Sequence, residues 1–191
     1  MTGPIETEIK IPIKDGVDAA RALVESHGYR VTAPRTHQVD QVFDFPDRTL
    51  RESGRLLRLR SESGSSENRG AILTYKGPAE LNSPHKSREE LETSAGDGAT
   101  MELILNRLGF VPSFRYEKYR TTFGAPEEPG LIVIDETPIG VFLELEGPAY
   151  WIDRAAELLG FTPQDYVTAS YAALYRDFLM YHGGPPDMVF V

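Results

Sequence analysis

Polar and apolar residues alternate along much of this chain, as they do in strands that have one face in a core. In the first such stretch Glu6, Glu8 and Lys10 fall on one face, and isoleucines fall on the other. In a later stretch Arg58 and Arg60 oppose two leucines in the same way. The ranges predicted as strands are 5–11, 39–45, 55–62, 71–76, 88–93, 113–123, 130–136 and 140–147.

Apolar residues at helical spacing, with cap and stop residues beside them, predict helices between these strands. Asp15 and Asp47 are the expected N-caps of the first two helices, and Thr162 with Asp165 forms a capping box for the last. The predicted helices span 15–28, 48–53, 99–108, 149–159 and 162–182. The Gly/Ser-rich segment 63–69 reads as a hairpin loop, and the tail 183–191 is expected to fray.

The charged residues on the strand faces form an acidic and a basic group. The acids are Glu6, Glu8, Glu90, Glu92, Asp135, Glu144 and Glu146. The bases are Lys10, Arg58, Arg60, Lys76, Arg88, Lys118 and Arg120. An antiparallel sheet with one face in water would give this pattern, and so would a closed barrel. Because several helices also need an apolar face to pack on, we expect an α+β fold. It is an eight-stranded antiparallel β-barrel, or tunnel, with a charged interior and helices packed outside.

Charge inside a barrel is costly unless it is paired or binds ions. Glu6 and Glu8 would lie about 7 Å apart on one strand face and repel each other by about 2 kcal/mol at an effective dielectric near 20. A divalent cation would remove this repulsion, and carboxylate oxygens suit Mg²⁺ or Mn²⁺. The convergent Arg and Lys side chains suit a long polyanion such as a triphosphate. A carrier of apolar ligands would need the opposite interior.

The bulk composition narrows the class of protein. The 191 residues carry a formal net charge of −9, which disfavours nonspecific binding to nucleic acid or a membrane surface. The chain has no cysteine, which excludes disulfides and thiolate metal sites, and its four histidines show no metal-ligand spacing. There is no apolar signal-peptide core and no membrane-spanning apolar run, so a cytoplasmic enzyme or binding domain is expected.

Seven blocks of sequence resemble a known family. The segment Glu6-x-Glu8-x-Lys10 is similar to the ExExK signature of the CYTH superfamily, also called triphosphate tunnel metalloenzymes. The other blocks follow in the family order at 41–60, 73–77, 88–92, 117–120, 134–135 and 142–146. The resemblance covers about 5–178 and is nearest the class IV adenylate cyclase and thiamine triphosphatase branch. We therefore expect a CYTH-like tunnel domain at 1–182 and a C-terminal tail at 183–191.

This resemblance implies a ligand set and roles for the charged residues. The ligands would be Mg²⁺ or Mn²⁺ and a small triphosphate: ATP, thiamine triphosphate or tripolyphosphate. Lys10 would contact phosphate, or help deprotonate the nucleophile if nearby cations lower its pKa. The implied metal ligands are Glu6, Glu8, Asp135, Glu144 and Glu146, with Glu90 and Glu92 as further tunnel acids. The implied phosphate-binding residues are Arg58, Arg60, Lys76, Arg88, Lys118 and Arg120. Dimers occur in the family, so a homodimer is a further expectation by analogy.

The chain departs from the family pattern at Phe43. Some triphosphatases carry a tyrosine in this block that partners the lysine, and phenylalanine can neither donate nor accept a proton. Tyr29, Tyr116 or Tyr119 could substitute only by pointing inward.

Three readings of the chemistry remain open at this stage. Water could attack the terminal phosphorus of a triphosphate, or the ribose 3′-hydroxyl of ATP could attack the α-phosphorus to give cyclic AMP and pyrophosphate. The block pattern and Ser170-Tyr171 favour the cyclase branch, although branch membership does not fix the reaction. The third reading is a non-catalytic polyphosphate-binding or signalling module, and the complete acidic set argues against it.

Overall fold

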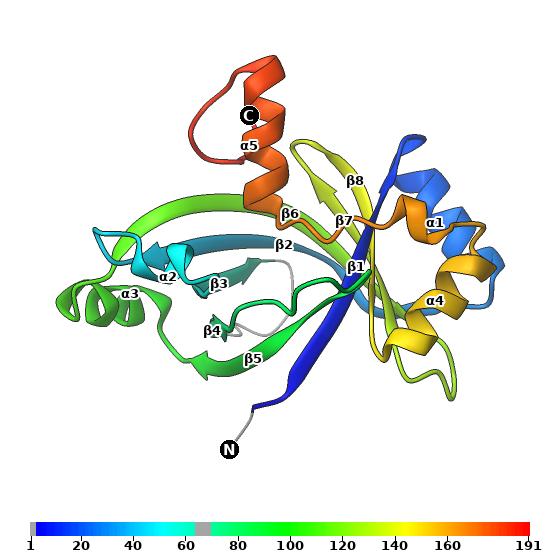
Figure 1. The fold of residues 1–191 in the computed structure, drawn as a ribbon, viewed down its shortest axis with the longest axis horizontal. Helices are drawn as coiled ribbons and strands as arrows, with labels where there is room; N and C mark the ends of the chain where they lie inside the picture. Colours follow the sequence, from blue (N-terminus) through cyan, green and yellow to red (C-terminus); the bar gives the residue numbers. More distant parts are fainter. Residues whose placement is uncertain (1–2, 64–69) are drawn as a thin grey trace.

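The computed structural model describes residues 3–63 and 70–191, and eight strands in these ranges close into an antiparallel barrel (Figure 1). The strands are β1 (Ile5–Ile13), β2 (Arg30–Asp44), β3 (Leu56–Ser63), β4 (Ala71–Lys76), β5 (Lys86–Ala95), β6 (Val111–Gly124), β7 (Leu131–Thr137) and β8 (Gly140–Glu146). Their order around the barrel is β1-β5-β4-β3-β2-β6-β7-β8. The predicted fold class is confirmed.

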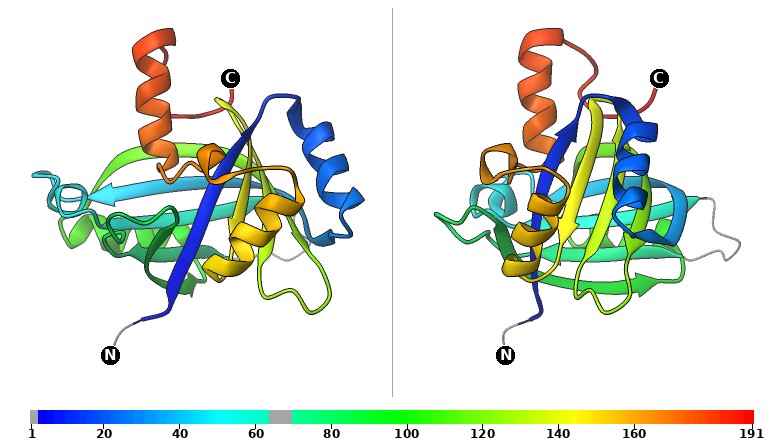
Figure 2. Two further views of the ribbon diagram at one scale, coloured as in Figure 1. Left: turned by 45° about the vertical axis from the view of Figure 1, so that its right-hand side comes forward. Right: turned by 90° about the vertical axis from the view of Figure 1, so that its right-hand side faces the viewer.

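Helices cover the outer face of the barrel. Figure 2 shows α1 (Gly16–Ser26) and α4 (Ala149–Leu158) against the outside of β1, β7 and β8. The largest core lies between these elements, and its side chains include Ile9, Leu143 and the fully buried Trp151. A second cluster lies under α3 (Gly98–Arg107), where Leu105 packs on Phe43. Because the apolar side chains are buried outside the barrel, the charged faces of the strands point inward, as predicted.

Strand β2 begins at Arg30, well before the predicted strand 39–45. Its first half is polar and contains Pro34, so it lacks the alternation expected of a strand with one buried face. It pairs with β6 through register shifts between Val31 and Ala33 and between Ala33 and Thr36. Tertiary pairing thus overrides a weak local pattern.

The capping residues of the short helix α2 (Thr49–Glu52) differ from the prediction. Asp47 Oδ1 does accept a hydrogen bond from Thr49 N at 3.1 Å. However, the carboxylate of Asp44 accepts from the backbone N–H groups of Leu50 at 2.9 Å and Arg51 at 3.0 Å. Asp44 therefore fixes α2 to the end of β2, beside one mouth of the barrel.

The prediction of one long helix over 162–182 is wrong. The capping box closes only a short 3₁₀ turn, η1 (Pro163–Asp165), and α5 (Tyr171–His182) starts separately after its N-cap Ser170. Between the two, Val167 pairs with Lys10 of β1 through backbone hydrogen bonds of 2.9 and 2.8 Å. An extended backbone that pairs with a strand cannot also be helical.

The prediction of a frayed tail is also wrong. Met188 is fully buried and lies alongside β6, where its N–H donates to Arg115 O at 3.0 Å and its carbonyl accepts from Glu117 N at 2.9 Å. Most of the predicted loop 63–69 lies outside the described residues. No helix in the described part of the chain combines the length and apolar character needed to cross a membrane.

Candidate functional site

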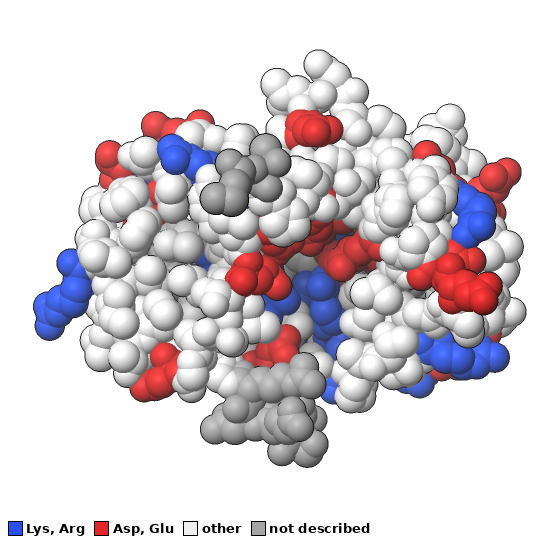
Figure 3. Space-filling view, turned by 90° about the horizontal axis from the view of Figure 1, so that it is seen from below, with Lys and Arg blue, Asp and Glu red and all other residues white. Residues whose placement is uncertain are grey.

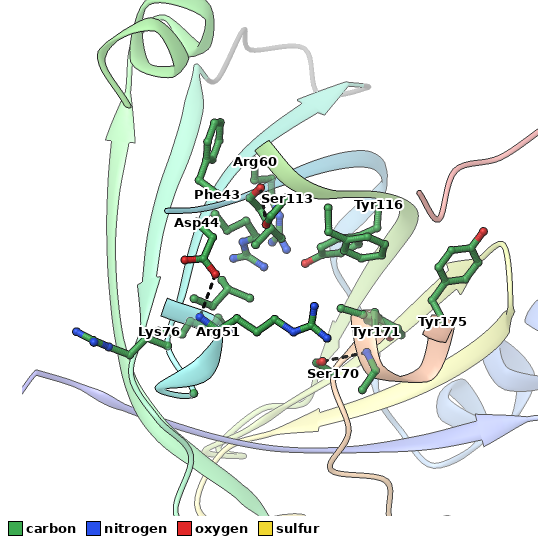
Figure 4. A pocket seen from close by; sticks show the side chains of 18 of the residues that line it. Phe43, Asp44, Arg51, Arg60, Lys76, Ser113, Tyr116, Ser170, Tyr171 and Tyr175 are labelled. Atoms are coloured by element: carbon green, nitrogen blue, oxygen red, sulfur yellow. Dashed lines mark hydrogen bonds between the residues drawn. The ribbon is translucent and has the colours of Figure 1, made fainter. Parts of the chain in front are cut away.

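The barrel interior encloses a cavity of about 1060 Å³ lined by charged side chains. Seen from below in Figure 3, acidic and basic side chains gather together in a central hollow. The cavity lining includes every predicted site residue except Asp135, which is fully buried in the barrel wall. Figure 4 shows Asp44 and Arg51 on one side of the cavity, opposite Tyr116 and Tyr171.

Three glutamates, Glu6, Glu8 and Glu146, form the candidate metal centre of the cavity. One oxygen from each lies within 4.8 Å of the others. Glu8 and Glu146 are direct neighbours in the β1–β8 pairing, and Glu6 lies one step along the same face. Burial raises the pKa of Glu146 to about 7, and its carboxylate neighbours add to this rise while Arg120 opposes it. Three close acids that line one cavity are a ready set of oxygen ligands for a divalent cation.

Lys10 lies between two carboxylates, 3.0 Å from Glu8 Oε1 and 3.1 Å from Glu144 Oε1. Burial alone would lower the pKa of Lys10, but Glu144 and Glu8 outweigh it and raise the pKa above its usual value. The expectation that neighbouring cations lower the pKa of this lysine is therefore wrong. Lys10 is an ammonium that can neutralise negative charge in the cavity.

The guanidiniums of Arg58 and Arg60 share one acid, Asp40, which the sequence analysis did not single out. Asp40 is fully buried, with Oδ1 2.8 Å from Arg60 Nε and 3.3 Å from Arg58 Nε. Burial works to raise the pKa of Asp40, but Arg60 and Arg58 prevail and hold it at about 2. Asp40 is the cross-strand partner of Arg60 in the pairing of β2 with β3, a register that the sequence analysis did not predict.

Asp135 plays the same structural part for Lys118 and Arg120. Its Oδ2 lies 2.7 Å from Lys118 Nζ and 2.7 Å from Arg120 Nη2. Arg120 also contacts Glu144 and lies 3.4 Å from Glu146 Oε1. Asp135 and Glu144 thus pair with cations and lie outside the trio Glu6, Glu8 and Glu146.

A third group surrounds Lys76, whose Nζ lies 2.6 Å from Glu6 Oε2 and 3.0 Å from Glu90 Oε2. Burial raises the pKa of Glu90 to about 8, and a hydrogen bond with Glu6 contributes to this rise. Glu92 accepts from Thr74 at 2.7 Å and lies 3.3 Å from Arg58. These acids therefore hold the cations of β3 and β4 in place.

Arg88 and Lys86 complete the basic lining on β5. The buried Nε of Arg88 has no hydrogen-bond partner among the described residues. Lys86 Nζ lies 2.8 Å from Glu8 Oε1, and burial lowers the pKa of Lys86 to about 8. Lys86 was missed because its segment reads as loop, although it stands in phase with Arg88.

Of the three tyrosines considered as substitutes for the one missing at Phe43, Tyr116 is the one that lines the cavity. Phe43 packs with Leu59 and Leu105 under α3, so its ring belongs to the outer cluster. Tyr116 lines the cavity, whereas Tyr29 lies in the outer core. Tyr119 packs against His37 with the ring centroids 4.8 Å apart and the ring planes tilted by 34°.

Tyr171 packs in an aromatic cluster, and it also has a polar role that the sequence analysis missed. Its hydroxyl donates to Asp135 Oδ2 at 2.9 Å. Tyr116 and Tyr171 are therefore the inward-facing phenols near the charged groups.

Comparisons with known proteins agree with this geometry. The family model described as CYTH domain matches residues 4–152. A protein of Methanocaldococcus jannaschii named "putative adenylate cyclase" is 35% identical over 144 residues, which are 74% of this chain and 76% of that protein.

Solved structures share the fold. A "putative adenylate cyclase" from Vibrio parahaemolyticus is 21% identical with a TM-score of 0.77, covering 91% of this chain and 99% of that one. A "putative adenylyl cyclase" from Hippeastrum, described as having a dominant triphosphatase activity, is 19% identical with a TM-score of 0.66, covering 91% and 95%. On the family match and the curated relative together, the chain belongs to the CYTH domain family.

Proposed function

We propose that the protein is a divalent-metal-dependent enzyme that acts on a triphosphate. The observation that carries this proposal is the convergence of opposite charges in one closed interior. Arginines and lysines from five strands line the same cavity as the trio Glu6, Glu8 and Glu146. Such an interior would bind a polyanion together with the cation that accompanies it.

Each group of residues has a distinct part in this proposal. Glu6, Glu8 and Glu146 would hold Mg²⁺ or Mn²⁺, which would neutralise charge on the phosphoryl oxygens. Lys10, held between Glu8 and Glu144, would contact phosphate at the edge of this centre. The other proposed phosphate ligands are Arg58, Arg60, Lys76, Lys86, Arg88, Lys118 and Arg120. Positioning and charge neutralisation supply most of the catalysis in phosphoryl transfer.

Hydrolysis of the triphosphate is the first candidate reaction, and cyclisation of ATP is the second. The Hippeastrum structure, whose described activity is dominantly that of a triphosphatase, supports hydrolysis. For cyclisation, the cavity lining also includes Tyr175 and Leu179 of α5, beside which an organic group could lie. The relatives named as adenylate cyclases support the same reading.

Product analysis tests the proposal. The protein is incubated with ATP, thiamine triphosphate or tripolyphosphate, each with Mg²⁺ or Mn²⁺ and with a chelator as control. Orthophosphate without cyclic AMP identifies a hydrolase, and cyclic AMP with pyrophosphate identifies a cyclase. A protein that binds tripolyphosphate but turns over none of the three substrates with either metal is a binding module, and the enzymatic proposal is then wrong.

A further inference from the structure

Tyr171, the first residue of α5, reaches from the helix into the charged interior of the barrel. Its ring centroid lies 5.3 Å from Lys10 Nζ and 5.2 Å from Lys118 Nζ, within the range of cation–π contact. Its hydroxyl donates to Asp135 Oδ2 at 2.9 Å. A residue of the last helix therefore touches groups on β1, β6 and β7.

Asp135 receives three kinds of donor, and they are not equivalent. Lys118 donates to Oδ2 and Arg120 donates to both carboxylate oxygens, each at 2.7 Å. Both of these cations also line the cavity, whereas Asp135 does not. Tyr171 is the uncharged donor to this carboxylate, and its hydroxyl has no competing acceptor among the hydrogen bonds of the described residues.

Binding of phosphate would change this balance. Under the proposed function, Lys118 and Arg120 donate to phosphoryl oxygens and share their hydrogens less fully with Asp135. Asp135 is fully buried, so water cannot replace the donors that it loses. Burial, with Asp135 and Glu144 nearby, keeps the pKa of Tyr171 well above its ordinary value, so its hydroxyl keeps its proton.

We propose that Tyr171 is a positioning residue that keeps Asp135 hydrogen-bonded while Lys118 and Arg120 turn to the phosphates. Hydrogen bonds hold the backbone just before Tyr171 in place, and this fixes the position of its hydroxyl. Ser170 caps α5 by accepting from Ala173 N at 3.2 Å, and the preceding Val167 is bonded to the backbone of Lys10. Tyr171 thereby links the docking of the last helix to the affinity of the cavity for phosphate.

Calorimetric titration with tripolyphosphate in the presence of a chelator tests this proposal without any need for turnover. Tyr171→Phe keeps the ring and removes only the hydroxyl. Since a hydrogen bond to a charged group is at stake, we expect the affinity to fall about tenfold. In an Asp135→Asn background the same change should alter the affinity by less than about twofold, because the carboxylate charge is gone.

Tyr166→Phe is the matched control. Tyr166 also donates its hydroxyl to an aspartate, Asp153 Oδ1, at 3.1 Å, but the pair lies outside the cavity. This variant should bind tripolyphosphate like the wild type. In turnover assays Tyr171→Phe should raise KM and leave kcat within about twofold, because the hydroxyl acts on binding rather than on the reacting atoms.

The outcomes separate the two proposals. If the wild type binds tripolyphosphate and folded Tyr171→Phe binds it equally well, Tyr171 has no positioning role. The same conclusion follows if Tyr166→Phe weakens binding as much, or if the loss persists unchanged in the Asp135→Asn background. If the wild type binds tripolyphosphate neither with the chelator nor with Mg²⁺ or Mn²⁺, the phosphate-binding function fails, and the role of Tyr171 fails with it.

Discussion

Two buried aspartates, Asp40 and Asp135, organise the basic side chains of the cavity. Each has no exposed surface and each contacts two cations, Arg58 and Arg60 for the first. A buried cation that is paired with a carboxylate avoids the full cost of burial. When phosphate binds, the cation can give up some of its hydrogen bonds to the carboxylate and donate to phosphate instead. These aspartates would thus fix the direction of the phosphate ligands without contacting the substrate.

Removing the charge of Asp40 should destabilise the protein. Asp40→Asn leaves two guanidiniums without their shared partner, so we expect the free energy of unfolding to fall by about 3 kcal/mol. Urea unfolding measures this change. Asp18→Asn, at an exposed acid of α1, should change stability by less than about 0.5 kcal/mol. An Asp40→Asn variant as stable as the wild type would show that the pair is not needed.

The same pair predicts how stability depends on pH. Asp40 has a pKa of about 2 in the folded chain, below its ordinary value of 3.8, so the unfolded chain takes up the proton first as pH falls. Its stabilising contribution is complete above 3.8 and is lost as pH falls toward 2. From about pH 5 to about pH 3, the difference in unfolding free energy between wild type and Asp40→Asn should narrow by about 1 kcal/mol. A difference that is constant over this range would contradict the assigned pairing.

The candidate metal centre predicts a selective loss of metal affinity. Glu146→Gln removes one carboxylate of the trio, and we expect Mn²⁺ affinity measured by calorimetry to fall by more than about tenfold. Glu157→Gln, at an exposed acid of α4, serves as the control and should bind Mn²⁺ like the wild type. Equal affinities in the two variants would show that Mn²⁺ binds at residues other than Glu146.

At the scale of elements, two segments after α4 add backbone pairs to strands of the closed barrel. Strand β5 pairs with β1 only from Ile5 to Glu8, and the next part of β1 pairs with β8 on one side alone. Val167 adds its backbone at Lys10, and the tail around Met188 runs beside β6. Both additions are made by backbone pairing and leave little trace in the sequence pattern.

Truncating the buried side chain of Met188 should lower the stability of the protein. Met188→Ala would leave a cavity beside Tyr116 and Tyr175, so we expect a loss of about 2–3 kcal/mol in the free energy of unfolding. Met180→Ala on α5 is the control, because that side chain belongs to a residue that is 73% exposed. Urea unfolding of both variants measures the effect, and equal stabilities would mean that the tail contributes nothing.

The strands with clean alternation could be predicted from the sequence, and they carry most of the site. Lys86 was missed because Pro84 suggested a loop, and Asp40 because its neighbours in phase, Gln38 and Val42, are uncharged. The sequence gives no sign of the hydrogen bond made by Tyr171, because its acceptor, Asp135, comes close only once α5 is in place. Capping and periodicity could not reveal the break near Val167, since its cause is a partner far away in the chain.

At the scale of the whole molecule, acids and bases meet inside, and the formal net charge of −9 describes the chain as a whole rather than its cavity. Convergence of the charged rows on a closed interior could be predicted, because helices had to occupy the apolar side. The strand order around the barrel could not be predicted, since it depends on which edges meet after collapse.

Such an interior predicts that a polyanion stabilises the entire fold. A ligand present at about 100 times its Kd adds about 2.7 kcal/mol, which for a chain of this size raises Tm by about 5–10 °C. Tripolyphosphate should give this shift in a thermal scan. Sulfate at the same ionic strength should give a smaller one, because it can reach fewer of the cations. Equal shifts would show that general salt effects account for the result.

The backbone pairing between Val167 and Lys10 ties a segment that follows α4 to β1. A nascent chain that has emerged only as far as α4 would carry the charged strands but not the partner of Lys10 or the phenol of Tyr171. By the role proposed for Tyr171, such a chain would bind phosphate more weakly than a chain that includes α5.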